Sequence, residues 1–112
     1  MEQENAISPQ LWRSLDGYDL ESGFGRTCPG CKQEYEAGDR LVVRTERPAS
    51  TNEWTVSSIV CRECTQQSLS DDEQRKAVEQ ALVSAEVTVA AMTLVLDGET
   101  ARLLDRSPAS ET

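Results

Sequence analysis

Two pairs of cysteines constrain this chain more than any other feature of its sequence. The first pair lies in TCPGCKQ (residues 27–33) and the second in VCRECTQ (residues 60–66), and the chain has no other cysteine. Two residues separate the thiols within each pair, and 29 residues separate the pairs. A C-x2-C segment turns tightly, so its backbone N–H groups point at the sulfur atoms and stabilise their charge. Two such segments can surround one ion with four thiolates.

A structural zinc site is the interpretation that this spacing favours. Four thiolates in a tetrahedron form a closed site, in which no position is left for water. The absence of histidine from the chain excludes a mixed site with imidazole ligands. The predicted metal ligands, for one Zn²⁺ per chain, are Cys28, Cys31, Cys61 and Cys64.

The first two thirds of the chain predict one short helix and several strands. ISPQLWRSLDG has the signature of a helix, with Ser8 as its N-cap and Pro9 at its first position. Residues 32–46 predict a strand, a Gly-Asp turn and a second strand. Residues 54–60, WTVSSIV, predict a further strand that runs directly into the second cysteine pair.

The last third predicts a helix and then a hairpin. Residues 70–84 begin with a capping box, Ser70 and Glu73, and continue with helical spacing of apolar residues. Residues 85–104 alternate like strands around Asp97-Gly98, a typical two-residue turn. We therefore expect an α+β fold: a small zinc-knuckle β-hairpin domain followed by an α-helix and a C-terminal β-hairpin. The expected segments are an N-terminal segment with a short helix (1–26), a four-cysteine hairpin unit (27–66), a helix plus hairpin packed on it as one domain (67–104) and a flexible tail (105–112).

Residues 27–65 resemble small zinc-finger proteins of the zinc-ribbon or treble-clef type. In a treble clef the helix begins directly after the second cysteine pair, whereas the predicted helix begins six residues after Cys64. The motif therefore indicates the ligands but does not decide between the two types. The chain has 20 acidic and 11 basic residues, a net charge of −9, and only two lysines. This composition is similar to that of small C-x2-C…C-x2-C zinc proteins of haloarchaea, since hydrated carboxylates suit concentrated salt.

Other uses of the four cysteines are open. Two structural disulfides would need an oxidising compartment. CPGC resembles the redox motif of thioredoxin-like and glutaredoxin-like proteins, which belongs at the start of a helix. The spacing of the two pairs also resembles rubredoxins, which implies a redox iron and electron transfer. Rubredoxin cysteine segments are typically followed by glycine, where this chain has Lys32 and Thr65.

The sequence predicts a non-catalytic protein. Histidine is absent, and no nucleophile motif or Gly-rich phosphate loop is present. We expect a cytoplasmic protein-interaction or regulatory module, because the sequence has no secretory signal and no apolar run near 18 residues. Residues 99–104 are expected to form an edge strand to which a partner protein could pair. The alternative is a nucleic-acid-binding regulator that uses Arg26, Lys32, Arg40, Arg44, Arg47 and Arg62.

Overall fold

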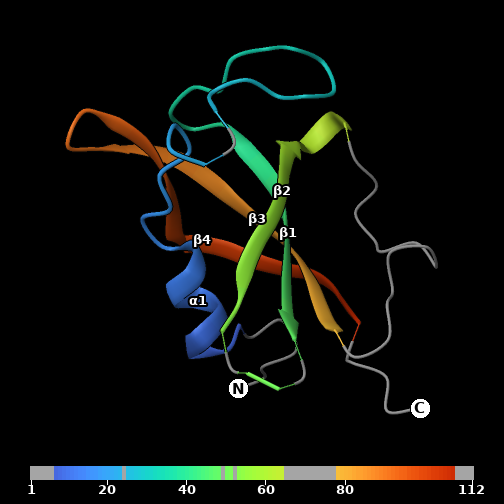
Figure 1. The fold of residues 1–112 in the computed structure, drawn as a ribbon. Helices are drawn as coiled ribbons and strands as arrows, with labels where there is room; N and C mark the ends of the chain where they lie inside the picture. The colour runs from blue at the N-terminus through green and yellow to red at the C-terminus, as the bar shows by residue number, and fades with distance from the viewer. Residues whose placement is uncertain (1–6, 24, 49, 52, 65–77, 108–112) are drawn as a thin grey trace.

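The computed structural model describes residues 7–23, 25–48, 50–51, 53–64 and 78–107. Its elements are α1 (Pro9–Leu15), β1 (Arg40–Pro48), β2 (Thr55–Cys61), a short 3-10 helix η1 (Arg62–Cys64), β3 (Val78–Ala90) and β4 (Thr93–Ser107). The strands form one antiparallel sheet in the order β2-β1-β3-β4, and α1 lies against it (Figure 1).

The main core lies between one face of the sheet and the N-terminal segment. Its largest fully buried side chains include Leu15, Leu20, Leu41, Ile59 and Leu96. A smaller cluster on the other side of β1 and β3 is centred on Val42 and Leu82. In the described part of the chain, no helix is long and apolar enough to cross a membrane.

The helix predicted in residues 7–17 is present as α1. Ser8 caps α1, because its Oγ accepts a hydrogen bond of 3.2 Å from the backbone N–H of Leu11. Pro9 occupies the first helical position, where its missing N–H costs nothing. The strand predicted at residues 54–60 is β2, and the second strand predicted within 32–46 is β1. The first strand predicted there is only an isolated bridge between Thr27 and Glu34.

The predicted α+β fold class is wrong. Among the described residues, four antiparallel strands dominate the structure, and one short α-helix accompanies them. The helix predicted at residues 70–84 is the main error, since residues 78–84 belong to β3 and 70–77 lie outside the described residues. β3 is paired with β1 on one side and β4 on the other, so sheet pairing overrides the helical propensity of its Ala, Gln, Glu and Leu residues.

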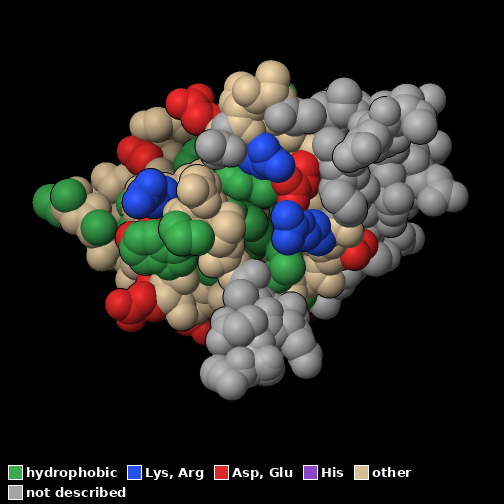
Figure 2. Space-filling view, turned by 90° about the horizontal axis from the view of Figure 1, so that it is seen from below, with side chains coloured by type: hydrophobic (Ala, Val, Ile, Leu, Met, Phe, Trp, Pro, Cys, Tyr) green, Lys and Arg blue, Asp and Glu red, His purple; other side chains and the backbone are tan. Residues whose placement is uncertain are grey.

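The turn of the C-terminal hairpin also differs from the prediction. It lies at Ala91-Met92, and Asp97-Gly98 is inside β4. The register breaks there, because Glu86 pairs with Asp97 while Ser84 pairs with Arg102. The hairpin projects from the body of the molecule (Figure 1), and the corresponding end of the space-filling view carries hydrophobic side chains (Figure 2).

Gly98 does not form a turn but allows α1 to pack closely against β4. Its backbone N–H donates a hydrogen bond of 3.0 Å to Oδ1 of Asp16. A Cβ at this position would lie 2.7 Å from Cβ of Asp16 and from Nε1 of Trp12. A residue with a side chain would therefore push the C-terminal end of α1 away from β4.

The edge of β4 is covered over part of its length. The backbone N–H groups of Gly17 and Leu20 donate to the carbonyl groups of Leu96 and Leu94, at 2.8 and 3.1 Å. β4 is an edge strand of the sheet, as expected, but the chain's own N-terminal segment pairs with it at residues 94–96. The pairing of β4 with β3 is irregular between Asp97 and Arg102, within the 99–104 segment that the sequence suggested as a docking strand.

Candidate metal centre

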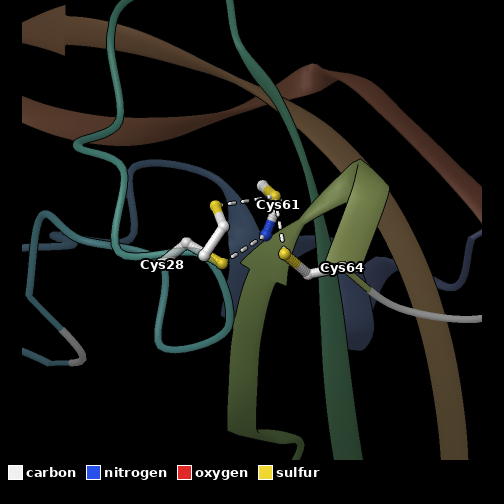
Figure 3. A group of neighbouring side chains, drawn as sticks. Cys28, Cys61 and Cys64 are labelled. Carbon is white, nitrogen blue, oxygen red and sulfur yellow. Dashed lines mark hydrogen bonds between the residues drawn. The ribbon is translucent and has the colours of Figure 1, made fainter.

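The four cysteines meet at one end of the sheet. Cys61 is the last residue of β2, Cys64 ends η1, and Cys28 comes from the loop that precedes β1 (Figure 3). Cys31 lies on the same loop as Cys28. All four Sγ atoms lie within 4.8 Å of one another. The structure therefore brings together every cysteine that the sequence predicts as a ligand.

The first cysteine segment is a tight turn closed by backbone hydrogen bonds. The N–H of Cys28 donates to the carbonyl of Gln33 at 2.9 Å, and the N–H of Lys32 donates to the carbonyl of Cys28 at 2.8 Å. Lys32 has φ +69°, the left-handed conformation that glycine adopts most easily. The N–H of Gly30 points at Sγ of Cys28, 3.3 Å away.

The second cysteine segment contacts the first directly. The N–H of Cys61 donates to Sγ of Cys28 at 3.4 Å, so the end of β2 supports the sulfur of the other segment. A Cβ on Gly30 would lie 3.0 Å from both Cβ and Sγ of Cys64. The Pro-Gly turn of the first pair thus leaves room for the last cysteine of the second pair.

The site is anchored in the core on one side and open on the other. Cys28 is fully buried, Cys61 is half-buried, and Cys31 and Cys64 are exposed. Tyr35 is buried beneath the site, and its hydroxyl donates to the carbonyl of Ile59 at 3.3 Å. Burial and the neighbouring Cys28 sulfur raise the pKa of Tyr35. Sequence reasoning gave Tyr35 no role; its only signal is an aromatic residue within a polar segment.

The thiols of the site compete for protons. Burial raises the pKa of Cys28, but backbone N–H groups of both cysteine segments donate hydrogen bonds to its sulfur and lower that pKa to about 6. Burial raises the pKa of Cys61, and hydrogen bonds with the other thiols, that of Cys61 first, raise the pKa of Cys64. Four adjacent thiols cannot all ionise without a cation, and a divalent metal would replace their protons.

Two of the sulfur–sulfur distances are close to those of a tetrahedral metal site. Zinc–sulfur bonds of about 2.3 Å place tetrahedral sulfurs about 3.8 Å apart. Sγ of Cys61 lies 3.3 Å from Sγ of Cys64 and 3.7 Å from Sγ of Cys31. A disulfide needs about 2.05 Å, and all four cysteines are free thiols. The cluster could hold a metal ion, and it fits a small zinc-ribbon-like protein.

Polar groups surround the open side of the cluster. A pocket of about 340 Å³ adjoins Cys61, and its lining includes Asp39, Arg40, Arg62 and Glu63. Arg26, which precedes the first pair, lies 3.8 Å from Glu21 in an exposed ion pair. The charged groups at this end are therefore of both signs.

A family model with the description "Domain of unknown function (DUF8112)" matches residues 10–103, a span that includes all four cysteines. No curated protein and no solved structure matches the chain.

Proposed function

The chain belongs to the DUF8112 family, and we propose that this domain is a non-catalytic interaction module with one end held by a structural zinc ion. The observation that carries the proposal is the meeting of four sulfur atoms, from two segments 29 residues apart, within 4.8 Å. Zinc is the metal proposed, because closed four-thiolate sites in C-x2-C pairs are typical of structural zinc.

A structural role fits the chemistry of the site. Four thiolates fill a tetrahedral coordination sphere and leave no position for a substrate or a reactive water. Structural zinc contributes on the order of 10 kcal/mol of apparent folding free energy, as much as the whole stability of a small domain. The loop that carries Cys28 and Cys31 has little regular structure of its own, so a metal would supply most of its order.

A protein partner is better supported than nucleic acid. Within the described part of the chain, at least three of the six basic residues that the sequence suggested for nucleic-acid binding are paired with carboxylates: Arg26 with Glu21, Arg40 with Glu86 and Arg47 with Glu79. These pairs neutralise the charge that phosphates would need, on a chain of net charge −9. We propose that the module works in the cytoplasm and binds another protein.

Metal analysis of the purified protein tests the zinc. We expect one equivalent of zinc per chain and four titratable thiols after denaturation. One equivalent of iron, with the red colour of a rubredoxin-type centre, would replace the proposal by electron transfer. Less than half an equivalent of any metal, together with oxidised cysteines, would reject a metal centre altogether.

A matched pair of variants tests the structural role. We expect Cys28→Ser to remove native two-dimensional NMR shifts from residues 26–39 and 61–64, because the buried sulfur joins both segments. Ser50→Ala, an exposed change far along the sequence from either pair, should leave the spectrum native. Native shifts throughout these segments in Cys28→Ser would show that the metal is incidental to the fold.

A further inference from the structure

The tip of the β3–β4 hairpin is an apolar projection on an acidic protein. We define the hairpin tip as residues 89–92. Met92 is 95% exposed and Val89 is 55% exposed, and Ala90 and Ala91 between them are exposed too. The hairpin extends past the part of β3 that pairs with β1, and hydrophobic side chains lie at the corresponding end of the molecule (Figures 1 and 2). Exposed apolar groups gathered at one point are a feature of binding surfaces.

The backbone of the hairpin tip is also unfavourable for its residues. Ala91 has φ +53° and Met92 has φ +64°, so two consecutive non-glycine residues are left-handed. Turns of this kind prefer Asn-Gly or Asp-Gly, which are also more soluble. Neither folding nor solubility favours Ala-Met here. Strain in an exposed apolar turn therefore points to a contact made by these side chains.

The loop between Cys31 and β1 is hydrogen-bonded to the base of this hairpin. The N–H of Gly38 donates to the carbonyl of Val87, and the N–H of Val87 donates to the carbonyl of Asp39, both at 2.8 Å. Residues 38 and 39 lie on the loop that leads from Cys31 to β1. A metal that orders this loop would therefore also fix the direction in which the hairpin points.

The charges around the hairpin restrict what can bind. No lysine or arginine occurs between Lys76 and Arg102 in the sequence. Glu86, Asp97 and Glu99 lie near the hairpin base, and Arg40 of β1 lies 3.5 Å from Glu86, so these groups are three acidic and one basic. Insertion into an anionic membrane is disfavoured, because interfacial segments of that kind carry flanking cations. A dimer through two tips is also disfavoured, because four residues bury far less than the roughly 800 Å² per partner of a stable interface.

We propose that the hairpin tip inserts Met92 and Val89 into an apolar pocket of a partner protein whose rim carries basic residues. Methionine is an adaptable anchor for such a pocket, and the acidic base of the hairpin complements the basic rim. The proposal rests on the proposed function as an interaction module, to which it adds the contacting residues and the chemistry of the partner.

Photocrosslinking followed by binding with purified proteins tests the proposal. A benzophenone amino acid is placed at position 92 and, as the matched control, at Thr88, an exposed polar position on the same hairpin. In cells that naturally express the chain, we expect position 92 and not position 88 to give one crosslinked protein. That protein, purified, should bind wild type and Thr88→Asp alike, and Met92→Asp more than tenfold more weakly.

Several outcomes would overturn the proposal. These are no product from position 92, equal products from both positions, a product that is a second copy, a lipid or a nucleic acid, and binding that Met92→Asp does not change. The metal content of each variant is measured in parallel. A protein that keeps its zinc but shows any of these outcomes refutes the docking hairpin alone, and the structural zinc stands.

Discussion

At the scale of single residues, Glu79 stands out among the described residues as a buried charged side chain. Its side chain is 3% exposed and lies between two arginines. Nε of Arg47 donates to Oε1 at 3.0 Å, and Nε of Arg106 donates to Oε2 at 2.5 Å. The three residues belong to β3, β1 and β4, so one carboxylate joins three strands at the end of the sheet.

We predict that Glu79→Gln destabilises the protein by about 2 kcal/mol at pH 7, because it removes the buried counter-charge of Arg47, whereas Arg106 is 58% exposed and can be hydrated. Burial raises the pKa of Glu79, but hydrogen bonds from Arg47 and Arg106 outweigh it and lower that pKa. The stabilisation is therefore complete above the unfolded-state pKa of about 4.3 and is lost as the pH falls through the lower folded-state pKa.

Urea unfolding of wild type and Glu79→Gln between pH 7 and pH 3 checks both statements. The difference in free energy of unfolding between the two proteins should shrink only below about pH 4. Loss of metal in acid destabilises both proteins alike. Glu86→Gln is the control, since Glu86 is 43% exposed and lies 3.5 Å from Arg40, a surface pair worth at most about 1 kcal/mol. Equal effects of the two substitutions would contradict the role given to Glu79.

The clustering of the four cysteines at the candidate metal centre was the most predictable part of the molecule. A pair of metal-binding cysteines can be recognised from its C-x2-C spacing, because both thiolates must face the same ion. The glycine that follows rubredoxin cysteine segments is absent here, yet Lys32 adopts the left-handed conformation that such a glycine would supply. The left-handed backbone of Lys32 could not be predicted from the residue type, since this conformation is uncommon but allowed for lysine.

At the scale of elements, sequence reasoning was right where local chemistry decides and wrong where pairing decides. The cap and proline of α1 are local, and they predicted that helix. β3 carries good helix formers, but Ala81, Val83, Ala85 and Val87 are buried against the core while β1 and β4 pair on either side. Those partners are far away in sequence, so no pattern within residues 70–84 could reveal them.

The position of the hairpin turn gives a second prediction. We expect Ala91→Asn combined with Met92→Gly to raise the free energy of unfolding by about 1–2 kcal/mol, because Asn-Gly suits two left-handed residues. Chemical denaturation with zinc saturating measures the change. Gly98→Ala, at the dipeptide that the sequence favoured as the turn, should instead cost about 1–3 kcal/mol through its clash with α1. A lower free energy of unfolding in the Asn-Gly variant would contradict a turn at Ala91-Met92.

At the scale of the whole molecule, charge acts against compactness. A net charge of −9 on 112 residues means that most carboxylates repel one another in the folded state. Exposed ion pairs such as Arg26–Glu21 offset little of this repulsion. The Debye length falls from about 10 Å at 0.1 M to about 3 Å at 1 M, so added salt should remove more repulsion than attraction.

We therefore predict that the melting temperature rises with KCl from 0.2 M to beyond 1 M, measured by calorimetry with zinc saturating so that metal loss does not contribute. Glu34→Lys with Glu53→Lys, both at exposed positions, makes the net charge less negative by four and should flatten the rise. If the melting temperature of the variant rose as steeply with KCl as that of wild type, the cause would be stronger burial of the core and not screening of charge. A melting temperature that stays flat or falls would remove the inference that this acidic, lysine-poor composition suits concentrated salt. The proposal of a zinc centre would be unaffected by that result, because it depends on the four cysteines and not on the surface charge.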